Sequence, residues 1–167
     1  MTTSRPLAVL VCAFLLSGCI DPNERRPGLW LSGEVETAPV TDWSFTDDNL
    51  QIYLETRTWY GIRHSVTVVC AVYDGALYVP SVYYGRGEFP DERHWHANVA
   101  RDPRVRLQIG DKLYERRAVL VTDPAEWNGV LNGFVQKMPF WKDLAEKPDA
   151  ERPRLIFMRM DPPADAA

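Results

Sequence analysis

Hydrophobic residues recur along this chain in short runs that alternate with polar positions or stop at turn-forming residues. In the run 104–109, three aliphatic residues alternate with Arg104, Arg106 and Gln108. Because successive side chains of a strand point to opposite faces, this run predicts a strand with one buried face and one face that is wet or functional. Comparable runs predict strands at 29–35, 40–45, 50–58, 65–73, 76–82, 112–122 and 155–160.

Two of the turns between these runs are typical of β-hairpins. Asp74-Gly75 separates the runs 65–73 and 76–82, and Gly110-Asp111 separates 104–109 from 112–122. Since glycine adopts a positive φ at low cost, such pairs favour the tight turns that join neighbouring antiparallel strands. The sequence therefore predicts two hairpins.

Helical periodicity is confined to a few segments. Residues 91–101 are expected to form a helix that ends at Asp102-Pro103, because the residue before a proline avoids the helical region. In the next segment Asp123 can cap a helix start and Glu126 can reach back to the amide of Asp123. Apolar residues at helical spacing then face the core, namely Trp127, Val130, Leu131, Phe134 and Met138. With a further short helix at 140–147, the chain is predicted to be mainly β with short helices (α+β), folded as a small antiparallel barrel.

Composition indicates one globular domain, which we place at residues 29–161, followed by a loose tail at 162–167. Hydrophobic residues make up 46% of the chain, enough to build a core for a domain of this size. The net charge of −4 argues against a nucleic-acid partner, which usually requires a basic face. Cys70 is the only cysteine within this domain, and its apolar surroundings predict a small buried side chain rather than a reactive thiol.

The amino-terminal residues resemble the signal peptide of bacterial lipoproteins. Leu7–Leu16 is an unbroken apolar run, too short for a membrane span of about 20 residues. It ends in Leu16-Ser17-Gly18-Cys19, which resembles the lipobox. The resemblance implies cleavage before Cys19 and acylation of that residue. Because each buried methylene contributes about 0.8 kcal/mol, several acyl chains hold a protein stably on a membrane.

Three expectations follow from the lipobox resemblance. Residues 1–18 are the signal peptide that is removed, and residues 19–28 form a lipidated tether whose reach is at most about 30 Å. The domain is lipid-anchored in the cell envelope and faces the periplasmic side. Ile20 follows the cysteine where an aspartate would favour the inner membrane, so we expect the outer membrane.

A second resemblance rests on residues 95–103 (WHANVARDP), followed by the strand 104–107. The pattern is Trp, two variable residues, Asn, an aliphatic residue, two more residues, and Asp before Pro. Upstream, Thr56-Arg57 and Gly61–Ser65 are similar to a basic glycine loop and the strand that follows it. Together these motifs resemble the split β-barrel flavin-binding proteins, most closely the deazaflavin-dependent nitroreductases and more distantly the pyridoxamine phosphate oxidases. The resemblance covers residues 56–122, under half of the chain.

This resemblance implies a split antiparallel β-barrel that forms a homodimer and binds FMN or a deazaflavin in a groove near the subunit interface. The cofactor-binding residues that it implies are Arg57, Arg63 and Ser65 at the phosphate, Ser81 near the groove, and His94 and Trp95 on the flanking helix. It assigns no catalytic residue. The chain departs from the family pattern at Trp95, where pyridoxamine phosphate oxidases have a phosphate-binding lysine. It departs again at Trp59 and Tyr60, where nitroreductases usually carry basic residues.

Other site chemistries have little support in the sequence. His94 and His96 are two residues apart, so on a helix they point in different directions, and no metal site is expected. A single histidine could ligate haem, but nothing in the sequence specifies it. No nucleophile elbow for a hydrolase and no glycine-rich nucleotide loop is found.

Three functional hypotheses remain open. The chain is a membrane-tethered flavin- or deazaflavin-dependent oxidoreductase acting on a small molecule, a barrel that binds a small planar ligand without turnover, or a structural or interaction protein of the envelope. The first predicts that Arg57 and Arg63 face an open groove. The third predicts that Trp59, Tyr60 or Trp95 fills that groove.

Overall fold

The computed structural model describes residues 28–49, 51–85, 87–91, 93–148 and 151–164. Its strands are β1 (Glu34–Val35), β2 (Ile52–Arg57), β3 (Arg63–Val68), β4 (Ala71–Tyr73), β5 (Ala76–Tyr83), β6 (Arg104–Ile109), β7 (Lys112–Leu120) and β8 (Arg154–Asp161). Its helices are the 3-10 turn η2 (Ser44–Thr46), α2 (His94–Arg101), α3 (Pro124–Lys137) and α4 (Pro139–Ala145). The predicted signal peptide, Cys19 and tether residues 20–27 lie outside the described residues.

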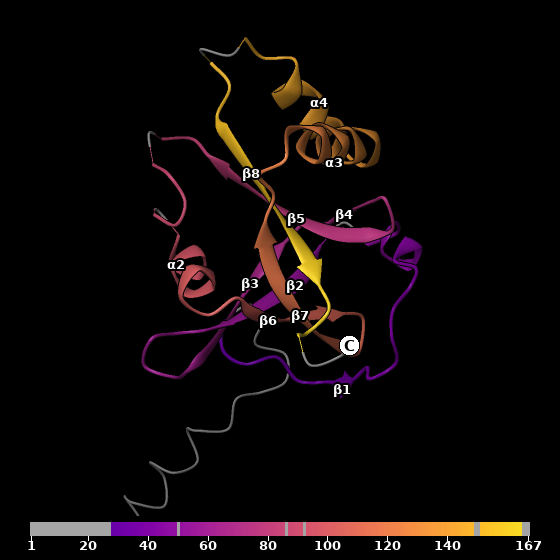
Figure 1. The fold of residues 1–167 in the computed structure, drawn as a ribbon, viewed down its shortest axis with the longest axis vertical. Helices are drawn as coiled ribbons and strands as arrows, with labels where there is room; N and C mark the ends of the chain where they lie inside the picture. The colour runs from indigo at the N-terminus through magenta and orange to yellow at the C-terminus, as the bar shows by residue number, and fades with distance from the viewer. Residues whose placement is uncertain (1–27, 50, 86, 92, 149–150, 165–167) are drawn as a thin grey trace, which may run out of the picture.

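The strands form an eight-stranded sheet that curls upon itself (Figure 1). Its order is β3-β2-β6-β7-β8-β5-β4, with antiparallel neighbours throughout, and β1 pairs in parallel with β7. The two ends of this order, β3 and β4, are consecutive in the chain and are separated only by Val69 and Cys70. The opposite edges of the sheet are therefore held together covalently, and the split antiparallel β-barrel expected from the sequence is confirmed.

Both predicted hairpins are present. Asp74 and Gly75 have φ values of 49° and 73° between β4 and β5, and Gly110 has a φ of 59° between β6 and β7. In the second hairpin Ile109 pairs with Lys112 across the turn. The turn chemistry thus fixes the register of the strands on either side of each turn.

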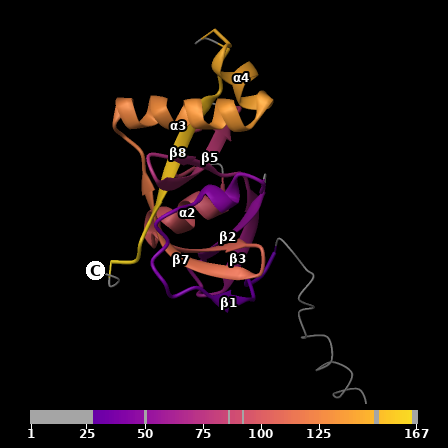
Figure 2. The same cartoon turned by 90° about the vertical axis from the view of Figure 1, so that its right-hand side faces the viewer.

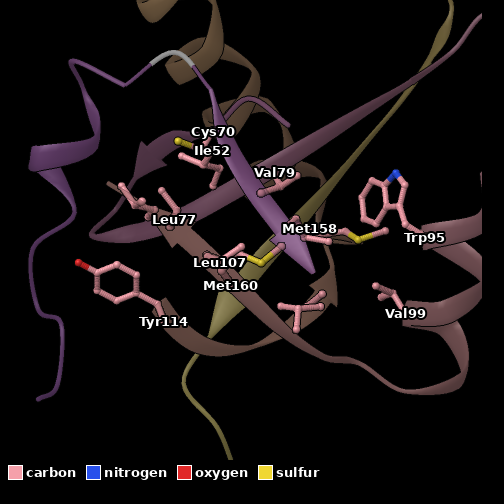
Figure 3. Close-up of a cluster of buried hydrophobic side chains, with 14 of the residues drawn as sticks. Ile52, Cys70, Leu77, Val79, Trp95, Val99, Leu107, Tyr114, Met158 and Met160 are labelled. Atoms are coloured by element: carbon pink, nitrogen blue, oxygen red, sulfur yellow. The ribbon is translucent and has the colours of Figure 1, made fainter. Parts of the chain in front are cut away.

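The interior of the barrel is packed with apolar side chains (Figure 3). Leu54 and Leu107 are cross-strand partners on β2 and β6, and both are fully buried. Cys70 is fully buried in the same cluster, as its apolar surroundings predict, and this burial raises the pKa of its thiol. The barrel interior is therefore a hydrophobic core, so any ligand site must lie on the outside of the sheet.

A second core lies between the barrel and the two longer helices. Figure 2 shows α3 lying across β5 and β8. Phe134 of α3 is fully buried, with ring centroids 5.5 Å from Phe157 of β8 and 4.9 Å from Trp141 of α4. Gly133 lets the helix approach closely, because a Cβ there would lie 3.2 Å from the Val72 carbonyl of β4. None of the helices in the described part of the chain has the length and apolar character needed to cross a bilayer.

Of the two strands predicted near the start of the domain, the first is much shorter than predicted and the second is absent. Only Glu34–Val35 of the run 29–35 is a strand, because the Leu31 amide donates to the Glu55 carboxylate instead of to a neighbouring backbone. The run 40–45 contains no strand. The Asp42 carboxylate accepts hydrogen bonds from the amide and hydroxyl of Ser44 at 2.8 and 2.9 Å, and this local bonding favours a turn over a ladder.

Three further expectations need correction. The run 65–73 is two strands, since β3 pairs with β2 whereas β4 pairs with β5. The helix expected at 91–101 begins at His94, because Asp91 is part of a turn with Glu88. Asp123 does cap α3, accepting from the Glu126 amide at 2.7 Å, but the Glu126 carboxylate does not reach back to Asp123. It bonds instead to Tyr78 and Arg159 at 2.9 and 2.8 Å.

Candidate functional site

A row of charged side chains covers the outer face of four adjacent strands, β3, β2, β6 and β7. In the sheet register Arg57 lies opposite Arg63, and Arg104 lies opposite Arg117. Arg106 lies between Glu55 of β2 and Glu115 of β7. Cross-strand partners point to the same side of a sheet, as do residues two apart along a strand. These charged residues therefore share one face, opposite the face that carries Leu54 and Leu107.

The best-defined contact on this face is an ion pair between Glu55 and Arg63. Glu55 is only 3% exposed, and its Oε1 accepts from Arg63 Nη1 at 2.8 Å. Its Oε2 accepts from the Leu31 amide at 2.5 Å. Burial of a carboxylate is costly unless both oxygens have partners, and here each oxygen has one. Arg63 is thus held in place, while a third of its side chain stays exposed.

Two more arginines of the face are paired with carboxylates. Arg104 forms a bidentate contact with Asp102, with both N–O distances at 2.8 Å, and this contact lowers the pKa of Asp102 to about 2. Arg106 pairs with Glu115 at 3.1 Å across the β6–β7 ladder. Each pair has one exposed partner, Arg104 or Glu115, so it orients the side chains more than it stabilises the fold.

Arg57 and Arg117 differ from the other three arginines. Both are exposed, and neither forms an ion pair with any carboxylate in the described ranges. Their guanidinium groups have five donors each in a planar fork that suits phosphate. They are the groups on this face that a bound anion could engage without breaking an existing ion pair.

The charged face forms the wall of a cleft of about 500 Å³. Six arginines and three carboxylates line it, a formal charge of +3 in a chain whose net charge is −4; they are Arg57, Arg63, Arg104, Arg106, Arg116 and Arg117 with Glu55, Asp102 and Glu115. Apolar lining comes from Pro103, Pro163 and Ala164. Arg116 also lines the cleft, but its guanidinium carbon lies 4.9 Å from the Trp43 ring centroid. We call this site the arginine cleft.

Of the residues that sequence reasoning proposed for a cofactor, the structure brings together Arg57 and Arg63 in the arginine cleft. The other four do not line it. Ser65 is buried and its hydroxyl accepts from the Gly28 amide at 3.1 Å, and Ser81 is buried within β5 opposite Ile156. His94 is exposed at the start of α2, and Trp95 packs into the barrel core.

Other residues of the cleft were not named from the sequence. Arg104 and Arg106 lie on the face of β6 that the alternating pattern left open as wet or functional. Arg117 and Glu55 had no such signal, because they reach the cleft only through the pairing of β7 with β6 and of β2 with β6.

The aromatic residues that could have blocked a groove lie elsewhere. Trp59 and Tyr60 are 80% and 57% exposed in the loop between β2 and β3, and Trp95 belongs to the core. None of the three lines the arginine cleft. The cleft is therefore open, as the oxidoreductase and ligand-binding hypotheses require.

His96 is the one fully buried histidine among the described residues. Its Nδ1 lies 2.5 Å from the Tyr83 hydroxyl, and its Nε2 has no hydrogen-bond partner. The rings of Trp95, Phe89 and Tyr83 surround it at 4.0–5.6 Å. Burial lowers the pKa of His96 to about 4, with a smaller contribution from the Arg93 charge. Within the described residues there is no group of three or more side chains that could hold a metal ion.

Solved structures with a similar fold come from several bacteria. A conserved hypothetical protein, Rv2991 of Mycobacterium tuberculosis, matches with a TM-score of 0.50 and 17% identity over 83% of this chain and 84% of its own. The haem storage protein HutZ of Vibrio cholerae matches with a TM-score of 0.51 and 16% identity over 72% and 86%. A putative pyridoxamine 5'-phosphate oxidase of Listeria innocua matches with a TM-score of 0.49 and 19% identity over 71% and 88%.

Weaker matches include F420-dependent reductases and a domain-swapped dimer, with TM-scores of 0.45–0.48. No family model matches the chain, and no curated protein matches it. At these identities the likeness concerns the fold alone. This chain therefore has the fold of a split antiparallel β-barrel, similar to those of Rv2991 and HutZ.

Proposed function

We propose that this chain is a membrane-tethered oxidoreductase whose arginine cleft binds the phosphate of FMN or of a deazaflavin. The observation that carries the proposal is the presence of Arg57 and Arg117, both without an ion-pair partner in the described chain, in a cleft of about 500 Å³. Pockets for small molecules and cofactors are usually about 300–1,000 Å³ in volume. The fold supports the same proposal, since split barrels of this kind include F420-dependent reductases.

Electrostatics favours an anionic ligand at this site. The cleft is positive although the chain as a whole is negative, so the arginines are concentrated here rather than spread over the surface. Within the cleft the guanidinium of Arg63 is occupied by its ion pair with Glu55. Arg57 and Arg117 therefore remain to donate hydrogen bonds to the phosphate. When bound, the flavin or deazaflavin would supply hydride transfer, and the chain would supply placement and charge.

The proposal includes the lipid anchor. Acylation of Cys19 would hold the barrel at the membrane of the cell envelope, at most about 30 Å from its surface. Retention of the intact acylated chain in the membrane fraction, with the mass of the acylated terminus after proteolysis, tests this part. A homodimer is also part of the proposal, and the mass measured by sedimentation tests it.

The same cleft would serve a protein that binds a planar phosphate-bearing ligand without turnover, which is our second candidate. Haem is less well supported, because no histidine of the described residues lines the cleft. The two candidates differ in one measurement. In an oxidoreductase, a reduced nicotinamide or another hydride donor reduces the bound flavin and lowers its visible absorption, whereas in a carrier the absorption stays unchanged.

The direct test is the visible absorption spectrum of the protein after incubation with FMN or a deazaflavin and removal of unbound ligand. Bound chromophore is expected for the natural chain, with loss in the double variant Arg57→Gln, Arg117→Gln. Arg63 is unsuitable for this test, because its removal would leave the buried Glu55 carboxylate unpaired. Arg154→Gln is the matched control, since Arg154 is an exposed arginine of β8 outside the cleft. No uptake by the natural chain would refute the proposal.

A further inference from the structure

The loop between β2 and β3 presents three large apolar side chains to solvent. Trp59, Tyr60 and Ile62 are 80%, 57% and 52% exposed, and no charged residue lies between Thr58 and Ile62. Single exposed apolar residues are common on proteins, but three within four residues, two of them aromatic, form a cluster that usually marks a contact surface. We call Trp59–Ile62 the apolar tip.

The apolar tip is ordered by its own hydrogen bonds. The amide and the hydroxyl of Thr58 donate to the Ile62 carbonyl at 2.9 and 2.7 Å, and the Gly61 amide donates to the Thr58 carbonyl at 3.0 Å. Gly61 has a φ of 87°, which closes the turn. The Trp59 and Tyr60 rings pack edge to face with centroids 5.2 Å apart. The fold thus holds these rings outward and does not bury them.

The described chain begins next to this hairpin. The Gly28 amide donates to the Ser65 hydroxyl, and the Ser65 amide donates to the Gly28 carbonyl at 3.4 Å. Ser65 follows Ile62 by three residues, a separation of about 10 Å along a strand. The indigo start of the chain and the β2–β3 hairpin lie in the same lower part of Figure 1. Cys19 is nine residues before Gly28, so acyl chains on it would lie within about 30 Å of this point.

Positive charge flanks the apolar tip. Arg101, the last residue of α2, donates to the Arg57 carbonyl at the end of β2, which places a second guanidinium beside the loop. Arg63 begins the strand on the other side, but its charge is paired with Glu55, so Arg57 and Arg101 supply the positive charge beside the loop. Tryptophan and tyrosine prefer the boundary between lipid headgroups and acyl chains, and neighbouring arginines are attracted to lipid phosphates.

We propose that the apolar tip inserts into the headgroup region of the bilayer to which Cys19 is tethered, with Trp59 and Tyr60 as the inserted groups. The inference rests on the proposed lipid anchor. Two points of attachment, the acyl chains and the tip, set the orientation of the barrel on the membrane. The arginine cleft, whose Arg57 and Arg63 adjoin the loop, then opens close to the lipid surface, where an apolar substrate dissolved in the membrane could reach a bound flavin.

The test uses the full acylated chain reconstituted in vesicles of phosphatidylethanolamine and phosphatidylglycerol, with and without brominated acyl chains. Bromine quenches tryptophan fluorescence only at contact distance. Quenching is expected for the natural chain and should fall by most of its amplitude in Trp59→Phe. Trp127→Phe is the matched control and should keep the quenching, because Trp127 packs 5.3 Å from Phe157 in the second core.

Equal quenching in the natural chain and in Trp59→Phe would overturn the proposal, as would absence of quenching in both. Dissociation of a dimer by Trp59→Ser, with no quenching in vesicles, would show that a second copy of the chain covers the tip and would overturn it too. Loss of the chain from the vesicles, with no acyl mass on Cys19, would refute the anchor itself. FMN uptake measured on the same samples separates failure of the cleft proposal from failure of this one.

Discussion

The burial of His96 makes the stability of the fold depend on pH in a window that can be stated in advance. The pKa of His96 is about 4 in the folded chain, against about 6.5 for an unperturbed histidine. Protons therefore bind more readily to the unfolded chain, and stability is lost as the pH falls from about 6.5 towards 4. At 1.36 kcal/mol per pKa unit, the loss due to this one group approaches about 3 kcal/mol.

The assay is urea unfolding followed by circular dichroism between about pH 4 and pH 8, on the natural chain and on His96→Phe. The variant keeps an aromatic ring among Trp95, Phe89 and Tyr83, and it loses the bond to the Tyr83 hydroxyl at every pH. Carboxylates titrate equally in both proteins. The difference in the free energy of unfolding should be constant above about pH 7 and should shift by about 3 kcal/mol in favour of the variant by pH 4. Parallel curves throughout would refute the reasoning.

Three substitutions test the packing of the fold. Phe134→Ala empties a fully buried position between Phe157 and Trp141. It should lower the free energy of unfolding, measured with urea, by about 3–5 kcal/mol. A loss below about 1 kcal/mol would mean that the second core is not packed as described. Gly33→Ala places a Cβ 2.6 Å from the Asp111 carbonyl and should cost about 1–3 kcal/mol in the same assay. Glu55→Ala leaves Arg63 and the Leu31 amide without their partner, with an expected loss of about 1–3 kcal/mol. An unchanged midpoint would contradict either of the last two.

Local signals in the sequence predicted much of the fold. The Asp-Gly and Gly-Asp pairs predicted both hairpins because a turn with positive φ is decided by the residues in it. The strand 104–109 followed from strict alternation, and the start of α3 followed from Asp123, which caps it. The strand wrongly predicted at 40–45 failed because of hydrogen bonds between residues close together in the chain. Asp42 and Ser44 bond to each other, and the sequence gives no sign that they prefer this to a strand.

The candidate site was only partly predictable, because it is built by long-range pairing. Glu55 and Arg106 are 51 positions apart in the chain and become neighbours only through the β2–β6 ladder. In β7, Leu113 and Tyr114 are consecutive and both buried, since the segment around Gly33 covers Leu113. Because the buried positions of β7 do not alternate strictly, the sequence did not indicate that Arg117 lies on the charged face. Ser65 and Ser81 lie on the predicted strands, but burial keeps both from the cleft.

The central claim is that the arginine cleft recognises a phosphate on its ligand. It is tested most directly by the dissociation constants of FMN and riboflavin, which differ only in the phosphate, measured by fluorescence titration. A charged hydrogen bond contributes about 1.5–3 kcal/mol, so FMN should bind about tenfold or more tightly than riboflavin. The ratio should fall to about one in Arg57→Gln, Arg117→Gln and persist in Arg154→Gln. Equal affinities for the two ligands in the natural chain would contradict the account.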